Sequence, residues 1–423
     1  MSAAVQPLWS TLTQEAPVTT QLAADETVDL LVIGGGFQGL STARHAARRG
    51  LAVRVLEANA TLGEGASGLN GGQVIPGLKY DPEYLREHFG DQAAIFAAST
   101  ADAVFDLIRD ENLAVAHTRT GWIQAAHTET ALKLAQERVR QWQARGADVA
   151  FLDSAAIARL TGARGYLGGW TDRRAGVVDP FAFTQALAGL AAKAGAKITT
   201  GTRVVSLLRR DQRWEARTTD GRTVRATKVV AATNAYSDNL VPGLAQSLVW
   251  LHSFQIATQT LPPDLAATIL PEGQAVSDSR RILVYFRKSP DGRLMLGGRG
   301  PMRQPTGPED WAHLHRAMLR LYPALERVPI GKRWFGRVAM TPDHMPHIHE
   351  PEPGLATVVG CQGRGIGLMT AMGERLADYA ISGDRAALPL PVTPVRPIPF
   401  HRFRMVGIAA AIGWYRFLDA LER

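Results

Sequence analysis

The chain has 423 residues, 46% of them hydrophobic and 20% charged, which is typical of a folded globular protein and excludes wholesale disorder. That length predicts two closely joined domains rather than a single core. The net charge of +8 is scattered without a basic tract, so we expect no nucleic-acid partner. The only cysteine, Cys361, excludes an intrachain disulfide and a four-thiolate metal site.

The two ends of the chain carry no signal peptide or membrane span that we can predict. Residues 1–24 lack a basic region followed by an apolar run. The longest apolar stretch, Met405 to Trp414, is ten residues, whereas a span needs about twenty. We therefore expect a cytoplasmic protein. Residues 400–423 predict a helix docked on the protein itself or on a second subunit, with peripheral contact to the inner membrane surface as the alternative.

The first predicted elements form a β-α-β unit after an N-terminal arm, residues 1–27, that has no periodicity. A strand is predicted over Val28–Ile33, a helix over Leu40–Arg49 that Gly50 ends, and a second strand over Ala52–Leu56. This order is typical of a dinucleotide-binding fold.

Helices and strands alternate through the rest of the chain. Helical patterning covers 91–137, broken around Gly121 and Trp122, and returns at 180–195, 309–321 and 367–379. Strands are predicted at 197–208, 213–219, 223–231 and 354–360, with a strand-rich region over 247–300. Asp220-Gly221 predicts a hairpin turn. Such interleaving indicates a nucleotide domain assembled from distant segments.

A glycine fingerprint joins the first predicted strand to the first helix. Gly34 permits a tight turn, Gly36 lets a pyrophosphate approach the backbone, and Gly39 lets the helix press on the strand. The helix N-terminus then faces the phosphates. Glu57, at the end of the second strand, can accept hydrogen bonds from both ribose hydroxyls and would repel a 2′-phosphate. The fingerprint alone does not choose between NAD and FAD.

Two further glycine-rich segments follow strands. The segment 63–73 carries five glycines in eleven residues, which lets the backbone approach a flat ligand closely. The segment 360–367 again joins a strand to a helix. A helix N-terminus there could stabilise negative charge on a reduced flavin ring.

At these residues the chain resembles the D-amino-acid oxidase-like FAD-dependent oxidoreductases, with the nearest likeness to the gamma-glutamylputrescine oxidase, glycine oxidase and sarcosine oxidase group. Further matching stretches are Ala232-Thr233-Asn234-Ala235-Tyr236, Gly297-Gly298-Arg299-Gly300 and Thr341-Pro342-Asp343-His344-Met345-Pro346. The resemblance implies an α/β (α+β) fold: a Rossmann-like FAD-binding domain of residues 1–90, 150–240 and 335–385, a substrate domain of 91–149 and 241–334 with a large mixed or antiparallel sheet, and a C-terminal tail, 386–423.

The resemblance also implies which residues hold FAD. They are Gly34, Gly36, Phe37, Gln38, Gly39, Glu57, Ala58, Gly65, Ala66, Ser67, Asn70, Gly71, Gly72, Gln73, Val204, Thr233, Gly363, Arg364, Gly365 and Gly367. Two departures from the family pattern matter. Gly336 stands where sarcosine oxidases attach flavin through a cysteine, so we expect non-covalent FAD. Met295 stands where those enzymes place the lysine that helps oxygen accept electrons, so the resemblance favours a quinone or a protein over oxygen as the electron acceptor.

The chemical step needs few protein side chains, because a neutral amine held over flavin N5 can lose hydride without a strong protein base. Arg299, Arg337, Arg364 and Tyr285 are the candidates for orienting the substrate, since a guanidinium can bind a carboxylate through two hydrogen bonds. Each of them has a structural role as its alternative. Lys79-Tyr80 is a candidate border of the entrance. The histidines at 344, 347 and 349 are too loosely spaced for a metal site, and we expect no metal.

The sequence therefore predicts FAD-dependent oxidation of a small primary or secondary amine, a polyamine derivative or an amino acid, to an imine that hydrolyses. Oxygen or another acceptor would reoxidise the flavin. A tRNA-modifying flavoprotein and a non-catalytic FAD subunit that relays electrons are the alternatives. The first predicts salt-sensitive retention on RNA, and the second predicts bound FAD that no amine reduces.

Overall fold

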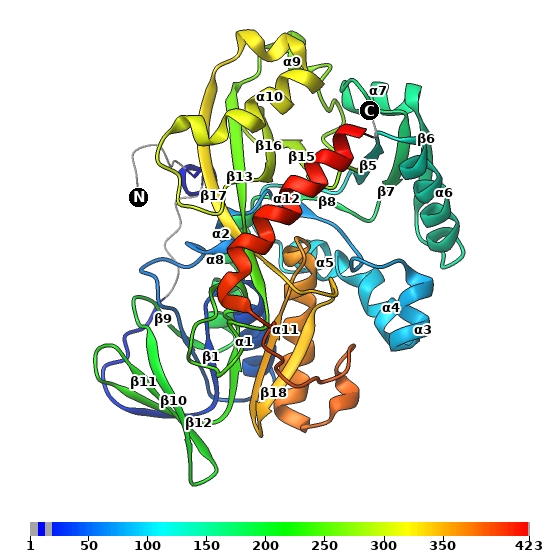
Figure 1. Cartoon of the computed structure of the whole chain (residues 1–423). Helices are drawn as coiled ribbons and strands as arrows, with labels where there is room; N and C mark the ends of the chain where they lie inside the picture. The colour runs from blue at the N-terminus through cyan, green and yellow to red at the C-terminus, as the bar shows by residue number, and fades with distance from the viewer. Residues whose placement is uncertain (1–6, 13–18, 422–423) are drawn as a thin grey trace.

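The computed structural model describes residues 7–12 and 19–421 and arranges them around two eight-stranded sheets and one three-stranded sheet (Figure 1). The first sheet has the order β10-β11-β12-β1-β2-β9, and β19 joins β12 with β18 outside it. Its strands are β1 (Glu26–Ile33), β2 (Val53–Leu56), β9 (Lys197–Thr199), β10 (Val204–Arg210), β11 (Arg213–Thr218), β12 (Thr223–Ala231), β18 (His347–Glu352) and β19 (Leu355–Val359).

The predicted β-α-β unit forms the centre of this sheet. Strand β1 pairs in parallel with both β2 and β12, and its apolar run is buried on both faces, as parallel strands require. Leu30 and Val32 point to a core shared with α1 (Phe37–Arg48), whereas Leu31 and Ile33 point to the opposite core. The helix begins three residues earlier than predicted, because the fingerprint residues Phe37 to Gly39 form its first turn.

Helices α1 and α11 (Gly365–Ser382) cross at very close range. A Cβ built on Gly373 would lie 2.4 Å from the Ser41 Cβ, and the Ser41 hydroxyl donates to the Thr370 carbonyl at 2.7 Å. Only glycine allows this approach. Each helix follows a parallel strand, β1 or β19, so both helices begin at the carboxyl edge of the sheet, where open α/β sheets bind ligands.

The second sheet is mixed, as predicted, with the order β17-β13-β16-β15-β14-β5-β7-β6; β14 and β5 are parallel and the other neighbours antiparallel. Its strands are β5 (Trp122–Ala126), β6 (Val149–Asp153), β7 (Gly168–Asp172), β13 (Val249–Thr260), β14 (Ala275–Asp278), β15 (Val284–Lys288), β16 (Arg293–Arg299) and β17 (Ile330–Met340). Ile256, Phe286 and Leu296 face a core closed by α10 (Ala312–Leu321). Tyr285 and Gln255 both pair with Gly297 and therefore lie on the opposite face.

The predicted domain boundaries differ from the observed packing at three places. Residues 150–172 were assigned to the FAD-binding domain, yet β7 pairs with β5 and β6 pairs with β7 in the second sheet. The same holds for residues 335–340 of β17, which pairs with β13 along its length. Conversely, α4 (Asp91–Ser99) and α5 (Asp102–Asp110) belong to the core around α1, not to the second sheet. Strand pairing is non-local, and sequence patterning does not reveal it.

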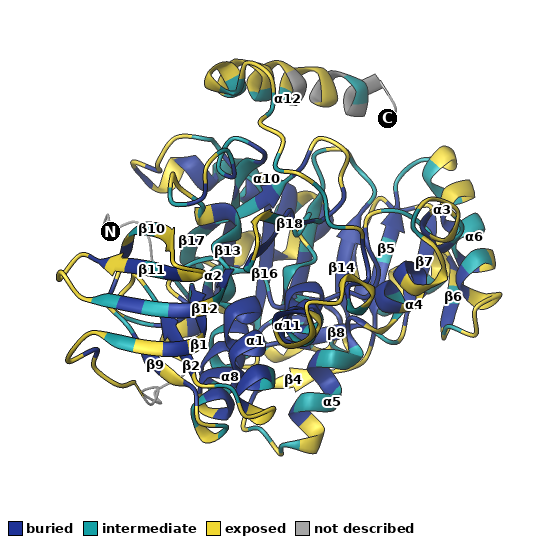
Figure 2. Ribbon diagram, turned by 90° about the horizontal axis from the view of Figure 1, so that it is seen from below, coloured by how far each residue is buried: buried dark blue, intermediate teal, exposed yellow. Residues whose placement is uncertain are grey.

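The remaining elements connect or cover the sheets. The small third sheet is β3 (Gln73–Val74), β8 (Gly176–Val178) and β4 (His117–Thr118). The other helices are α2 (Ala66–Leu69), α3 (Pro82–Phe89), α6 (Glu129–Gln143), α7 (Ser154–Thr161), α8 (Pro180–Lys193), α9 (Pro263–Ala266) and α12 (Arg404–Leu421). Figure 2 shows that α12 lies outside both sheets and is coloured mainly as exposed. Among the described residues, no helix has the length and apolar character to cross a membrane.

The N-terminal segment is more than a free arm where the structure describes it. A short 3-10 helix, Trp9–Thr11, places the side chains of Leu8 and Trp9 in a buried cluster with Met295 and Trp334. Residues 1–6 and 13–18 of the predicted arm lie outside the described part of the chain. Two apolar side chains within a polar segment are therefore enough to anchor it.

Candidate functional site

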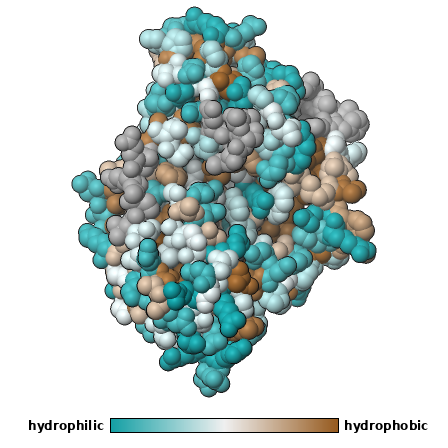
Figure 3. Space-filling model, turned by 90° about the vertical axis from the view of Figure 1, so that its left-hand side faces the viewer, coloured by the Kyte–Doolittle hydropathy of each residue, from teal (hydrophilic) through white to brown (hydrophobic). Residues whose placement is uncertain are grey.

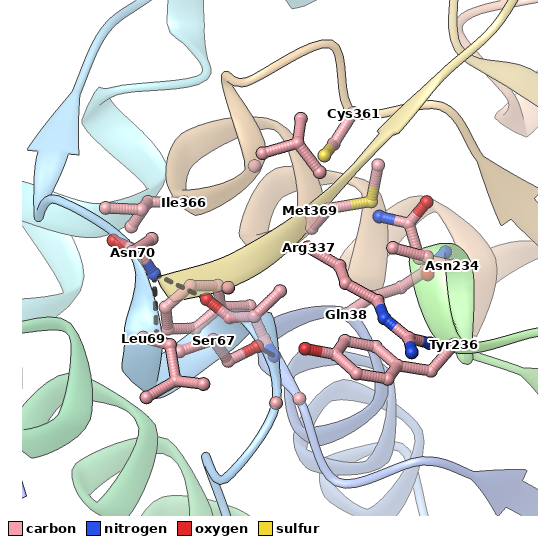
Figure 4. A pocket seen from close by; sticks show the side chains of 18 of the residues that line it. Gln38, Ser67, Leu69, Asn70, Asn234, Tyr236, Arg337, Cys361, Ile366 and Met369 are labelled. Carbon is pink, nitrogen blue, oxygen red and sulfur yellow. Dashed lines mark hydrogen bonds between the residues drawn. The ribbon is translucent and has the colours of Figure 1, made fainter. Parts of the chain in front are cut away.

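A cavity of about 420 Å³ opens between the first and second sheets, a size that ligand pockets commonly have (Figure 4). Most of the predicted FAD-binding residues line it: Gly34, Gly36, Phe37, Gln38, Glu57, Ala58, Gly65, Ala66, Ser67, Asn70, Gly71, Gln73, Val204, Thr233, Gly363, Arg364 and Gly365. Of the substrate-orienting candidates, Arg337, Arg364 and Tyr285 line the same cavity. The structure thus brings the three glycine segments together.

Four candidates do not line the cavity. Gly39 presses α1 onto β1, because a Cβ there would lie 2.0 Å from the Gly34 carbonyl oxygen. Gly367 packs in the same way on the backbone of Thr100, and Gly72 has a φ of +70° in front of Arg287. Arg299 ends β16 outside the lining. The three glycines therefore shape the site without facing it.

The N-terminus of α1 is shaped for a ligand that approaches the backbone. Gly34 has a φ of +109°, and a Cβ on Gly36 would lie 2.7 Å from the Ser67 hydroxyl. That hydroxyl accepts a hydrogen bond from the Phe37 N–H at 3.1 Å. The Gln38 side chain lines the cavity with both amide atoms buried and without a hydrogen-bond partner among the described residues. Buried amides are nearly always paired, so this one indicates a missing polar ligand.

Glu57 lies at the end of β2, where the fingerprint places its acidic residue. One carboxylate oxygen accepts a hydrogen bond from the Gly35 N–H at 2.7 Å. The other accepts from the Asn59 backbone and side-chain amides at 2.8 and 2.7 Å. These donors fix the carboxylate at the rim of the cavity, and the oxygen that accepts from Gly35 retains a lone pair for a ribose hydroxyl.

Side chains from elsewhere in the chain hold residues 69–72, at the end of α2. We call this segment the flavin loop, because the sequence resemblance predicts that Asn70, Gly71 and Gly72 contact FAD. The Leu69 carbonyl accepts hydrogen bonds from Gln255 Nε2 at 2.7 Å and from Trp334 Nε1 at 2.9 Å. The Asn70 carbonyl accepts from Trp9 Nε1 at 2.8 Å. Three donors, two from the second sheet and one from the N-terminal segment, therefore fix two successive carbonyls.

Arg287 holds the far end of the flavin loop. It is buried and donates to the Gly72 and Val178 carbonyls at 2.9 and 2.8 Å, with its guanidinium carbon 4.9 Å from the centroid of a Trp9 ring. Burial lowers its pKa to about 9, and the nearby Asp179 carboxylate opposes that shift. Arg287 therefore bonds the loop backbone, and it supports the cofactor side of the cavity indirectly.

Sequence reasoning missed these supporting residues. Trp9 lies in a segment without periodicity, and Gln255 and Trp334 lie in strands whose pairing is distant in sequence. Arg287 lies in a local hairpin, but its acceptors Gly72 and Val178 are 215 and 109 residues away. The one available signal was strand alternation. In each of these strands the residues lie on the face opposite the apolar core, where a polar or aromatic side chain needs a partner of its own.

Two cations with lowered pKa values lie on the cavity wall near α11. Lys79 is accessible to solvent through the cavity although protein surrounds it, and it makes no hydrogen bond or ion pair among the described residues. Burial, followed by the charges of Arg364, Arg138 and Arg299, lowers its pKa to about 8. Burial also lowers the pKa of Arg364 to about 10, and this side chain donates to the Pro76 carbonyl. The prediction that Lys79 borders the cavity is thus consistent with its position.

Arg337 lies deeper, between two aromatic rings. Its guanidinium carbon is 5.3 Å from the Tyr236 ring centroid and 4.4 Å from a Trp250 ring centroid. Figure 4 shows the Arg337 side chain reaching the Tyr236 ring from β17. Such stacking orients the guanidinium while leaving its N–H groups available.

Tyr285 forms part of the wall formed by the second sheet. Its hydroxyl and that of Ser253 are 2.6 Å apart, and burial raises its pKa to about 12 although this hydrogen bond opposes the shift. The ring fills the space beside Gly71, where a Cβ would lie 2.7 Å from it. Tyr285 is therefore a neutral, fixed wall at neutral pH.

The structure shows what surrounds Gly336 and Met295, the two positions at which the sequence departs from the family pattern. Gly336 lines the cavity with a prospective Cβ 3.2 Å from the Leu69 Cβ, next to the flavin loop. Cys361 also lines the cavity, but on the opposite segment, before α11. Met295 is buried with Trp9 and Trp334 and is absent from the lining. Neither position supplies a thiol or a cation beside the flavin loop.

A dinucleotide fold whose ligand cavity is closed by a second large sheet is the architecture expected of a two-domain flavin-dependent oxidoreductase. The chain belongs to the FAD dependent oxidoreductase family, which it matches over residues 29–379. It is 30% identical to a probable oxidoreductase OrdL of Rhizobium meliloti, covering 96% of this chain and 95% of the relative. It is 29% identical to the gamma-glutamylputrescine oxidoreductase of Escherichia coli, covering 93% of each.

The fold also matches solved structures. Glycine oxidase from Geobacillus kaustophilus superposes with a TM-score of 0.74 at 21% identity, covering 88% of this chain and 99% of that one. FAD is therefore the cofactor, and the cavity fits it: Gln38 has unpaired amide atoms, and a side chain in place of Gly36 would narrow the approach to the α1 backbone.

Proposed function

We propose that this protein oxidises a small primary or secondary amine that also carries a carboxylate. The observation that carries the proposal is the cation set of the cavity: Arg337, Arg364 and Lys79 line it, and Lys79 and Arg337 form no ion pair among the described residues. Unpaired cations on a cavity wall favour an anionic group and disfavour a diamine with two positive charges. The similarity to gamma-glutamylputrescine oxidoreductase supports an amine substrate.

The residues that hold FAD are part of the same proposal. Gly34, Gly36, Gln38 and Glu57 would hold the ADP half, and the flavin loop with Tyr285 would border the ring. FAD bound non-covalently supplies the two-electron acceptor for hydride from the amine carbon. The chain's own work is to bind the substrate carboxylate, to fix the amine carbon toward the ring, and to exclude water.

Arg337 is the proposed carboxylate ligand, because aromatic rings fix its guanidinium and leave its donors free. Tyr285 would limit the pocket on the side of the second sheet. Oxygen is the weaker candidate as electron acceptor, because Met295 is packed among tryptophans and provides no charge. The product imine would leave the site and hydrolyse in water.

The test is anaerobic reduction of the purified FAD protein, followed in the visible spectrum. We expect N-acylated diamines with a carboxylate, or amino acids, to bleach the flavin, and putrescine to leave it unchanged. The variant Arg337→Met should raise the substrate concentration for half-maximal bleaching without releasing FAD. Bleaching by putrescine alone would refute the proposal that the substrate carries a carboxylate. Bleaching by no amine would favour a protein that relays electrons instead.

A further inference from the structure

Helix α12 is an apolar helix that buries none of its described side chains. Val406 and Trp414 are 70% and 57% exposed, and Phe400, just before the helix, is 79% exposed. Phe403, Val406, Ala410 and Trp414 recur at steps of three and four, which places them along one side of the helix. Figure 3 shows hydrophobic residues, in brown and tan, gathered at the right-hand edge of the molecule. That edge corresponds to the front of the view in Figure 1.

The segment that leads into α12 and the first part of the helix are positively charged. Residues 385–418 contain five arginines, and the nearest aspartates are Asp384 and Asp419 at either end of that range. Arg402 and Arg404 lie where the helix begins, and neither forms an ion pair among the described residues. Arg402 stacks on Phe403 with its guanidinium carbon 4.7 Å from the ring centroid. Exposed aromatic rings therefore alternate with unpaired cations.

The opposite side of α12 faces the protein. Ile408 and Ile412 are half-buried, whereas Val406 and Trp414 are exposed. Burial lowers the pKa of Arg299 at the end of β16, and the nearby Tyr415 opposes that shift. The segment that leads to the helix has prolines at 389, 391, 394, 397 and 399, which makes it stiff. The helix is thus presented on the surface with its aromatic side outward.

We propose that α12 docks this protein on an anionic lipid surface, with the helix in the plane of the membrane and Phe403, Val406 and Trp414 in the headgroup region. Aromatic rings beside arginines are the composition of helices that lie in this interface. The proposal is independent of the substrate and extends the proposed function by giving the enzyme a location.

The experiment is co-sedimentation of the full-length FAD protein with vesicles. We expect binding to vesicles of phosphatidylcholine with one third phosphatidylglycerol, roughly tenfold or more above binding to pure phosphatidylcholine. Arg402→Gln with Arg404→Gln should lower the partition coefficient roughly 30-fold, the product of the contributions expected for two arginines. Val406→Asp should also abolish most of the binding, because it places a carboxylate at the contact.

Matched controls separate docking from general charge and folding. Arg213→Gln with Arg217→Gln removes two exposed arginines from β11, and Ile95→Asp alters a side chain on α4 that is 63% exposed. Both controls should bind like the parent, and all variants should keep the flavin spectrum. Equal binding by helix variants and controls overturns the proposal. Absence of vesicle binding, with self-association in sedimentation velocity that Val406→Asp removes, also overturns it and assigns α12 to a second copy.

Discussion

Replacing Trp9 with phenylalanine should weaken FAD binding although Trp9 lies outside the cavity lining. The change removes the donor that the Asn70 carbonyl accepts from at 2.8 Å, inside a buried cluster. A lost neutral hydrogen bond with a buried acceptor costs about 1–2 kcal/mol. If the flavin loop bears that cost only in the bound state, the FAD dissociation constant rises roughly 5- to 30-fold. Titration of apoprotein with FAD, followed by flavin fluorescence, measures it.

A matched substitution tests the reasoning. Trp214 is 2% exposed, and its indole N–H has no hydrogen-bond partner among the described residues. Trp214→Phe therefore makes the same loss of volume without losing a hydrogen bond, and FAD binding should stay within about twofold. Trp334→Phe should fall between the two, because Gln255 still donates to the Leu69 carbonyl. Equal dissociation constants for the Trp9 and Trp214 variants would refute the role of the loop hydrogen bonds.

Three further outcomes are expected. Gly39→Ala should abolish FAD binding, because the added Cβ would lie 2.0 Å from the Gly34 carbonyl oxygen. The control Gly189→Ala has open space around the added Cβ, and thermal unfolding should show that it stabilises α8 by about 0.5–1 kcal/mol. Lys79 is charged below its pKa of about 8 and becomes neutral as the pH rises, so the affinity of an anionic competitive inhibitor should fall above pH 8. Lys79→Met should flatten that pH profile, and a profile that keeps its inflection in the variant would exclude Lys79 as the titrating group. Tyr285→Phe should raise KM severalfold with kcat nearly unchanged, because only the hydroxyl contact is lost; a kcat loss above about a hundredfold would show a direct chemical role instead.

Local signals predicted the β-α-β unit and its glycine-rich turn. Glycine is needed at 34, 36 and 39 because of close contacts around one turn and the helix that follows it. The spacing of these glycines was therefore sufficient to predict the turn. The strands β6 and β7 were misassigned because they join the second sheet through the pairing of β7 with β5, whose partner residues lie 42 to 50 positions away. Arg299 was expected at the cavity from its glycine-rich surroundings, but strand register, which sequence does not give, places it outside the lining.

The three indole and amide donors to the flavin loop have a consequence for how the protein is made. Trp334 and its acceptor Leu69 are separated by 265 residues, and Trp9 and Asn70 by 61. A ribosome therefore releases the glycine fingerprint and the flavin loop long before β17 exists to fix that loop. Chains normally fold domain by domain as they emerge. Here tight cofactor uptake must wait until most of the chain has left the ribosome, so FAD joins a nearly finished protein.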